Sequence, residues 1–367
     1  MKQKAIIFHP AIAPYRIDFF NFMHDNYDLL VYFESDLVNS QQFNLNNLLK
    51  LSRFKYKILR LGFNIKSTSF RFGILYKIIK NKPDFVLTSE FGLITILVSF
   101  YNLFLVKTLK HYIICDDNIE ISKNRSGVRS LFRTIFSINS NGVLYSSNEI
   151  GQWNKNHISS KINPLILPII HDNNIFRQKI LESHDVAKNN ISKYHLTNKK
   201  ILLFVGRLIS IKNIPLIIEA MVNIEDSILI IIGRGKLQKD LSEQVLKYGL
   251  KNKVCFMGFQ SGIDLYSWFS ISHILILPSY FEPYGAVVNE ALLGGCYVLC
   301  SNIAGASSLI NDNNGATFNP NDKDEYLQKI KLLLSKVHPI SNNIVFERQS
   351  KMPVELIDEL NRLKKQL

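Results

Sequence analysis

The sequence Ser-Tyr-Phe-Glu-Pro-Tyr-Gly-Ala-Val-Val-Asn-Glu occupies residues 279–290 and decides how the rest of the chain is interpreted. It follows an apolar run at 273–278, which is typical of a buried parallel strand and closes with a proline. The next run, 286–293, has the pattern of a helix that ends at a Gly-Gly pair. A strand, a short polar turn and a helix start together predict a ligand site at the edge of an open α/β sheet.

The predicted helix start suits a phosphate group. The amides of Gly285, Ala286 and Val287 would lack acceptors within the helix and would lie at the positive end of its dipole. Glu282 precedes the helix and could face a sugar, whereas Glu290 lies about two turns further on and could accept hydrogen bonds from ribose hydroxyls. Taken alone, each glutamate is equally well interpreted as an ordinary helix charge.

The complete pattern is more specific than its parts. Glu282-Pro-Tyr284-Gly285, then Glu290, then Ala-Leu-Leu-Gly-Gly and an apolar strand at 297–300, resembles the donor-site signature of family 4 glycosyltransferases. These are retaining enzymes with the GT-B fold, an α/β architecture of two Rossmann-like doubly wound parallel-sheet domains that face each other across a cleft. The resemblance implies that Glu282 contacts the transferred sugar and that Glu290 holds the nucleotide ribose.

Length and composition agree with a chain of two globular domains. The 367 residues are 47% hydrophobic and 20% charged, which is ample material for two cores. Four cysteines without zinc spacing favour a reducing cytosol. The opening apolar run is too short for a signal peptide, and the run at 92–106 is too short for a membrane span, so we expect a cytoplasmic protein and a buried or interface helix there.

The first half alternates short apolar strands with helical segments, which predicts a doubly wound parallel sheet. We expect a first domain at 1–165, which would bind the acceptor, and a second at 166–345, which would bind a nucleotide sugar. By resemblance, a helix within 346–367 returns to the first domain. The expected strands of the first half are 4–8, 29–33, 84–89, 112–115 and 142–145.

Polar residues follow two of these strands and are candidates for the acceptor site. His9, Tyr15 and Arg16 follow the first strand, and the Pro-Tyr-Arg sequence is similar to that of bacterial family 4 enzymes that build surface polysaccharide. Asp116 follows Cys115 near the point where many family members carry a histidine, so it would accept a bond from the sugar or act as the acceptor's base. Local capping and turn roles remain the alternatives for these residues.

The second half contains further turns that would contact the donor. By resemblance, Gly206, Arg207 and Lys212 contact the diphosphate and stabilise the leaving nucleotide, so that Arg207 and Lys212 join Glu282 and Asp116 as catalytic candidates. Gly233 begins a Gly-Arg-Gly turn, a weak phosphate signal that is equally well a tight turn. Gly258 and Phe259 resemble the segment near the nucleotide base.

These features predict sugar transfer from a UDP- or GDP-linked donor to a hydroxyl of a glycan or polyprenyl-linked glycan. No metal ion or further cofactor is expected, since the protein supplies cations, and Asp322-Lys323-Asp324 is interpreted as a helix cap and not as a metal motif. Covalent attack by Glu282 and same-face attack guided by the phosphate both remain open. The alternatives are a nucleotide-sugar epimerase of the same fold and a basic nucleic-acid-binding protein.

The net charge of +14 is concentrated in the first 170 residues. Residues 50–82 mix basic and aromatic side chains, and 69–81 show helical spacing. Such a surface can lie on anionic lipid at the inner face of a membrane, and the same composition can bind nucleic acid or cover an ordinary core. We favour an ordinary surface helix for 69–81 itself, and the positive charge of the first half favours an anionic membrane surface, and no nucleic acid, as the partner.

Overall fold

The computed structural model describes residues 2–35, 49–65, 68–106, 108–169, 171–341 and 348–367. The chain forms two compact units, and each is described by itself. Unit 1 comprises Met1–Ile169 together with Ile357–Leu367, and unit 2 comprises Ile170–Leu356. The domain limit expected from sequence at 345/346 lies outside the described residues.

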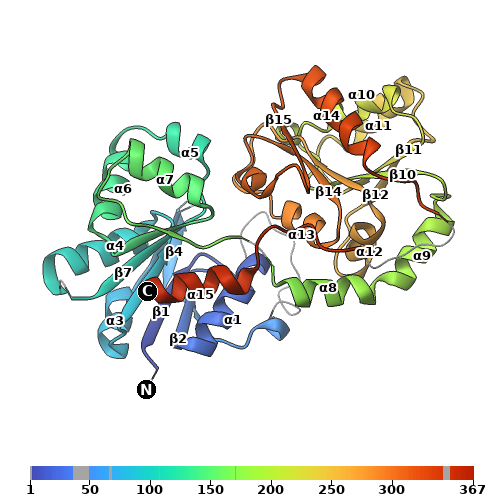
Figure 1. Cartoon of the computed structure of the whole chain (residues 1–367). Helices are drawn as coiled ribbons and strands as arrows, with labels where there is room; N and C mark the ends of the chain where they lie inside the picture. The colour runs from blue at the N-terminus through green and yellow to red at the C-terminus, as the bar shows by residue number, and fades with distance from the viewer. Residues whose placement is uncertain (1, 36–48, 66–67, 107, 170, 342–347) are drawn as a thin grey trace. The chain divides into compact units, whose positions relative to one another are not determined.

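Unit 1 contains a parallel sheet of seven strands in the order β3-β2-β1-β6-β7-β8-β9 (Figure 1). Strand β1 is an interior strand, and its Ile6 pairs with Leu30 on one side and with Val86 on the other. An antiparallel pair, β4 and β5, stands outside this sheet. The strands are β1 Lys4–His9, β2 Asp28–Phe33, β3 Lys55–Ile58, β4 Gly62–Ile65, β5 Thr68–Arg71, β6 Phe85–Ser89, β7 Lys110–Cys115, β8 Gly142–Tyr145 and β9 Pro164–Ile166.

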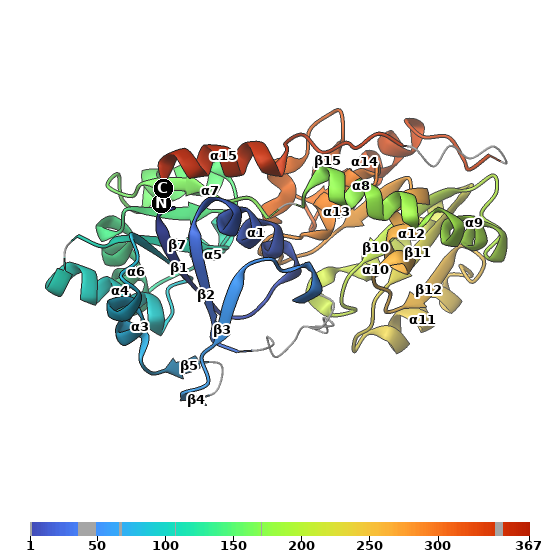
Figure 2. The ribbon, with the colours of Figure 1, turned by 90° about the horizontal axis from the view of Figure 1, so that it is seen from below.

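Helices cover both faces of this sheet because its central strands are apolar on both sides. Alternate residues of β1, Ile6 and Phe8, pack under α3 and α4, whereas α1 and α15 lie on the opposite face (Figure 2). The helices of unit 1 are α1 Ile17–Asn26, α3 Ile74–Asn81, α4 Leu93–Tyr101, α5 Ile119–Lys123, α6 Val128–Asn139, α7 Asn148–His157 and α15 Leu356–Gln366.

Unit 2 contains a parallel sheet of six strands in the order β12-β11-β10-β13-β14-β15. Figure 1 shows α10, α11 and α14 on one side of this sheet and α8, α12 and α13 on the other. The strands are β10 Lys200–Val205, β11 Ser227–Ile232, β12 Val254–Gly258, β13 Ile274–Leu277, β14 Tyr297–Ser301 and β15 Gly315–Phe318. The helices are α8 Asn173–Glu182, α9 His184–Lys193, α10 Ile214–Ala220, α11 Gln238–Lys247, α12 Ile263–Ile271, α13 Val287–Leu293 and α14 Lys323–Ser335.

Two doubly wound parallel sheets confirm the predicted fold class, and local expectations differ at two places. The helix expected over 69–81 is shorter, because β5 occupies its first residues and Gly73, with φ +73°, separates that strand from α3. Residues 160–200, whose polar and irregular sequence predicts a domain boundary, contain helices α8 and α9. The segment 92–106 forms α4 and a π-helical turn at Asn102–Val106, and within the described residues no helix is long and apolar enough to cross a membrane.

The last helix, α15, belongs to unit 1. Tyr112 on β7 donates a hydrogen bond of 3.1 Å to the carbonyl oxygen of Leu367, and Lys110 donates another of 3.0 Å. Leu360 and Leu363 are 2% and 1% exposed. The sequence spaces Leu356, Ile357, Leu360 and Leu363 as one apolar stripe, but Ile357 is 45% exposed, so the buried stripe is narrower than that spacing predicts.

The buried stripe of α15 should contribute to the stability of unit 1. We expect Leu360→Ala to lower the free energy of unfolding by about 2–4 kcal/mol, because it removes buried methyl groups and leaves a cavity. The matched variant Ile357→Ala changes an exposed residue of the same helix and should cost less than about 0.5 kcal/mol. Urea denaturation followed by fluorescence measures both, and equal losses would show that the stripe contributes no burial energy.

Candidate functional site

The strand order of unit 2 creates a switch point between β10 and β13. From β10 the chain proceeds outward to β11 and β12, then returns to place β13 on the other side of β10. The loops that follow β10 and β13 therefore leave the sheet in opposite directions and open a crevice at its carboxyl edge, where open α/β sheets bind ligands. Lys212 lies in the first of these loops and Glu282 in the second.

Lys212 and Glu282 form an ion pair across this switch point. The Lys212 Nζ contacts Glu282 Oε2, and the two side chains are 13% and 12% exposed. The main chains of the two loops are also joined, because the amide of Tyr280 donates a 2.8 Å hydrogen bond to the carbonyl oxygen of Ile211. The structure thus brings together a cation and an acid that are 70 residues apart in sequence.

Three predicted glycines lie on neighbouring strand ends. The Gly206 amide donates to the Ile232 oxygen at 3.0 Å, and the Gly233 amide donates to the Gly258 oxygen at 2.7 Å. Gly233 has φ +143°, and a Cβ built there would lie 1.9 Å from the Gly206 oxygen. This close approach of two turns requires glycine, so the tight-turn interpretation of Gly233 explains its presence without any ligand.

The other predicted residues of unit 2 surround α13. A Cβ on Gly285, which has φ +95°, would lie 2.7 Å from Leu277 and 3.2 Å from the Glu282 side chain, so the turn before α13 is packed directly against Glu282. Ala286 caps α13 and Val287 begins it. Tyr284 is buried, and its carbonyl oxygen accepts a 2.8 Å hydrogen bond from the Ala306 amide, which ties this turn to the segment after β14.

Two of the residues predicted to bind the donor are exposed, and a third lies beside a histidine that the sequence did not predict. Arg207 is exposed and makes no ion pair with another described residue, and Phe259 is 48% exposed. Glu290 on α13 has its Oε1 3.6 Å from Nε2 of His171. The sequence gives no direct signal for His171, because it lies far from Glu290 in the chain and precedes α8 in a polar segment.

Unit 1 has its own switch point, between β1 and β6, and candidate residues gather there. Arg16 is 0% exposed and donates from Nη2 to Oδ1 of Asp116, whose side chain keeps 24% of its surface exposed. Two further nitrogens of Arg16, Nε and Nη1, are buried and have no hydrogen-bond partner in the described part of the chain. Orphaned donors of a buried guanidinium are costly, and an oxygen of a water molecule or of a bound ligand would satisfy them.

His9 and Tyr15 lie beside this pair and are uncharged at neutral pH. Burial, followed by the nearby Arg16 charge, lowers the pKa of His9 to about 4. His9 Nδ1 lies 2.7 Å from the carbonyl oxygen of Ala11 and donates to it, which leaves Nε2 as an acceptor. Burial also raises the pKa of Tyr15 to about 12, so its hydroxyl remains a donor.

Glu90, which the sequence analysis did not name, completes the group. It follows β6 at the switch point, and its Oε1 accepts a 3.0 Å hydrogen bond from the Asp116 amide. Its φ of +57° is unusual for a residue with a side chain, and hydrogen bonds to Ile114 and Thr95 hold its backbone there. Burial, followed by the charges of Asp117 and Asp116, raises its pKa to about 8.

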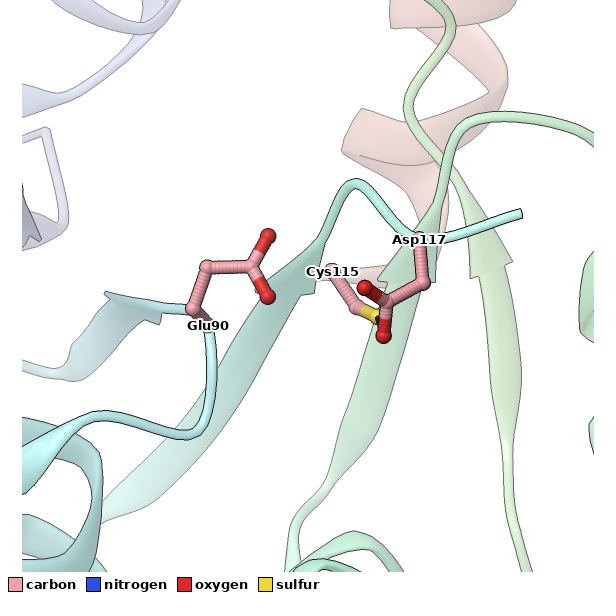
Figure 3. A group of neighbouring side chains, drawn as sticks. All are labelled: Glu90, Cys115 and Asp117. Atoms are coloured by element: carbon pink, nitrogen blue, oxygen red, sulfur yellow. Dashed lines mark hydrogen bonds between the residues drawn. The ribbon is translucent and has the colours of Figure 1, made fainter. Parts of the chain in front are cut away.

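Glu90 also lies beside Cys115 and Asp117, with ligand atoms within 4.8 Å of one another (Figure 3). Arg133 donates to Asp117 and to Cys115 Sγ, the latter at 2.8 Å, and Arg125 donates to the other Asp117 oxygen at 2.5 Å. Both oxygens of this carboxylate therefore face guanidinium groups. Burial raises the pKa of the Cys115 thiol well above its usual value. A protonated thiol and a protonated carboxyl beside the two guanidinium groups fit a buried ion-pair network. They fit a divalent metal ion poorly, because its ligands must be deprotonated.

The chain shares a domain with known glycosyltransferases. Residues 187–344 match the family described as glycosyl transferases group 1, and they include Lys212, Glu282 and Glu290. This part of unit 2 is therefore a glycosyl transferases group 1 domain.

Curated relatives match over segments about as long as this family match. An uncharacterized glycosyltransferase of Methanocaldococcus jannaschii is 32% identical over 142 residues, or 38% of this chain and 36% of the relative. An N-acetylgalactosamine-N,N'-diacetylbacillosaminyl-diphospho-undecaprenol 4-alpha-N-acetylgalactosaminyltransferase of Campylobacter jejuni is 29% identical over 138 residues, or 37% of each protein. The matches span little more than a third of these relatives, so they establish a shared domain and not a shared substrate.

Solved structures extend the likeness to the whole chain. The Anabaena protein HepE, in complex with UDP, superimposes with a TM-score of 0.74 at 14% identity and covers 100% of this chain and 99% of that one. At this identity the likeness shows the fold alone. The fold of the protein is GT-B, as the sequence analysis predicts.

The raised pKa of Glu90 makes stability depend on pH. The folded protein keeps a proton on Glu90 up to about pH 8, whereas the unfolded chain loses it near 4.5. The wild type should therefore lose stability relative to Glu90→Gln as pH rises through this window, by at most about 1.4 kcal/mol per pH unit and by less because Glu90 is partly exposed.

Urea denaturation at several pH values between 5 and 8 measures this difference. The matched variant Glu149→Gln, at an exposed glutamate of α7, should leave the pH dependence of the wild type unchanged. Parallel curves for the wild type and Glu90→Gln would contradict the assignment of a protonated carboxyl to Glu90.

Proposed function

We propose that the protein is a retaining, metal-independent hexosyltransferase that moves a sugar from a nucleotide diphosphate donor to a hydroxyl of a glycan acceptor. The observation that carries this proposal is the Lys212–Glu282 ion pair at the switch point of unit 2. It lies inside the domain that matches the glycosyl transferases group 1 family. A cation and an acid side by side suit a donor that has an anionic diphosphate joined to a neutral sugar.

The cations of the first loop would stabilise the leaving nucleotide. Breaking the bond between the anomeric carbon and the phosphate oxygen leaves negative charge on the diphosphate. Lys212 and the exposed Arg207 would neutralise that charge, and the first amides of α13 would add hydrogen bonds. One preorganised donor of this kind contributes about 3–4 kcal/mol to transition-state stabilisation. Because the protein supplies two cations, the proposed transfer needs no metal ion.

Glu282 and Glu290 would bind the other two parts of the donor. Donor binding would separate the Lys212–Glu282 pair, so that Lys212 meets the diphosphate and Glu282 meets sugar hydroxyls or the charge that develops on the anomeric carbon. Glu290, positioned beside His171, would accept hydrogen bonds from the ribose. Gly258 and Phe259, at the end of β12, would border the base. We favour uridine, because a neighbour of the same fold binds UDP.

The buried polar group of unit 1 would bind the acceptor. Asp116 is held by Arg16 and keeps part of its surface exposed, so it would accept the proton or a hydrogen bond of the attacking hydroxyl. Tyr15 and the orphaned nitrogens of Arg16 would donate to acceptor oxygens, and His9 Nε2 would accept from a hydroxyl.

The name of the Campylobacter jejuni relative contains diphospho-undecaprenol, which supports a polyprenyl-linked glycan as acceptor. Such an acceptor is anchored in lipid, and the first 170 residues carry most of the net positive charge. We therefore propose synthesis of cell-surface polysaccharide at the cytoplasmic face of a membrane, with the anionic lipid surface as a partner.

Removal of Lys212 should abolish most donor binding and turnover. We expect Lys212→Ala to lower kcat by on the order of 10²-fold, because the leaving diphosphate loses a preorganised cation. It should also reduce the thermal stabilisation that the best UDP-sugar gives the wild type. The control is Lys331→Ala, an exposed lysine beside the amino ends of β10 and β11 and therefore at the opposite edge of the sheet.

The assay follows UDP release with and without a polyprenyl-linked saccharide. Release that requires the saccharide supports transfer, whereas equal release in water alone would indicate a hydrolytic epimerase. Equal stabilisation of the wild type and Lys212→Ala by every nucleotide sugar would contradict the diphosphate role of Lys212. Salt-dependent binding of nucleic acid without affinity for any nucleotide sugar would replace the proposal with a nucleic-acid-binding function.

A further inference from the structure

An apolar ridge projects from one side of unit 1. It is formed by the outer faces of α4, the π-helical turn that follows it, and α6. Figures 1 and 2 show α3, α4 and α6 on the same side of the unit, and α4 contacts both of the other helices. The exposed residues of this ridge, with their exposed fractions, are Leu97 39%, Phe100 42%, Phe104 64%, Leu105 74%, Val128 69%, Leu131 60% and Phe132 40%.

The aromatic side chains of the ridge pack against one another, so they form one continuous surface. Phe104 stacks on Phe100 at 5.6 Å between ring centroids, Phe100 meets Phe136 edge-on at 5.7 Å, and Phe132 stacks on Phe136 at 5.9 Å. Phe136 is 3% exposed and anchors this aromatic series in the core. Contiguous exposed apolar surface of this kind marks an interaction site, since isolated exposed residues need no explanation but a packed series does.

The most exposed part of the ridge lies where the helix geometry changes. At Asn102 the α-helix gives way to a π-helical turn, and Phe104 and Leu105 project from that turn. π-Helical turns are rare and occur frequently at functional sites. The nine residues of α4 and the five of the turn are too few to span a bilayer, so the ridge can lie along an interface but cannot cross it.

The charge around the ridge indicates which kind of partner binds it. Between residues 37 and 115 the acidic residues are Asp84 and Glu90, whereas Lys and Arg are frequent from Lys50 to Lys82 and recur at Lys107 and Lys110, with none in the ridge segment 83–106 itself. Lys80 on α3 is exposed and lies over the ring of the exposed Tyr76. In a two-fold dimer each patch would meet itself, so cations would oppose cations. An anionic lipid surface attracts these cations and accepts the apolar side chains.

We propose that the ridge on α4, the π-helical turn and α6 inserts into the interface of an anionic phospholipid bilayer and holds unit 1 on it. This surface lies outside residues 50–82, the basic and aromatic segment of the sequence. This inference rests on the proposed function, because membrane binding would bring the enzyme to its lipid-linked acceptor. Vesicle binding requires neither donor nor acceptor, however, so the two can fail separately.

The test is co-sedimentation with vesicles of phosphatidylcholine, alone and mixed with phosphatidylglycerol. The wild type should bind the mixed vesicles, and added salt should weaken binding because the electrostatic part is screened. Phe104→Ser combined with Leu105→Ser should lower the partition coefficient by about tenfold or more, since two exposed side chains lose their apolar insertion. Lys80→Glu should weaken binding to mixed vesicles to a smaller extent.

The matched control is Leu246→Ser combined with Leu332→Ser, at residues of unit 2 that are 63% and 50% exposed. This variant should bind vesicles like the wild type. Unchanged melting temperatures and UDP-sugar binding show that each variant is folded. Binding by the ridge variant equal to that of the wild type would overturn the proposal. Absent vesicle binding by the wild type, or self-association that the ridge substitutions abolish, would overturn it as well.

Discussion

The ion pair between Lys212 and Glu282 depends on a single feature of chain topology, the return of the chain to the far side of β10. That return places two loops of opposite charge side by side at the carboxyl edge of the sheet. The pair is mostly buried, and a buried ion pair gains little net stability over an apolar contact because both ions lose hydration. Its value is therefore positional, since each partner holds the other ready for a ligand with complementary charge.

Unit 1 repeats this topology with different chemistry. Its switch point between β1 and β6 gathers Arg16, Asp116 and Glu90, and two further arginines, Arg125 and Arg133, neutralise the neighbouring Asp117. The lowered pKa of His9 and the raised pKa of Glu90 have the same origin, which is removal of charged groups from water. The neutral side chains of His9 and Glu90, beside an Arg16–Asp116 pair whose charges offset each other, suit the recognition of hydroxyls, whereas the loops of unit 2 suit an anion.

The fold could be predicted because its signals are local. Two-sided apolar strands, and the pattern from Glu282 to Glu290, required only neighbouring residues. The edge strands β3 and β9 lacked that signal, since β3 is exposed at three of its four positions. Glu90 and His171 were missed because their roles depend on contacts with residues that are distant in sequence. The sequence left a buried helix and an interface helix open for 92–106, because an apolar run does not reveal whether its outer face is covered.

The central claim is that Lys212 meets the diphosphate while Glu282 meets the sugar. Calorimetric titration of UDP, and of the UDP-sugar that best stabilises the wild type, into the wild type and Glu282→Gln tests it directly. The substitution removes the sugar contact and releases Lys212 from its partner. The UDP-sugar should then lose its advantage over UDP, and UDP should bind at least as tightly as to the wild type. Equal weakening of both ligands, or no change in either, would contradict the division of roles.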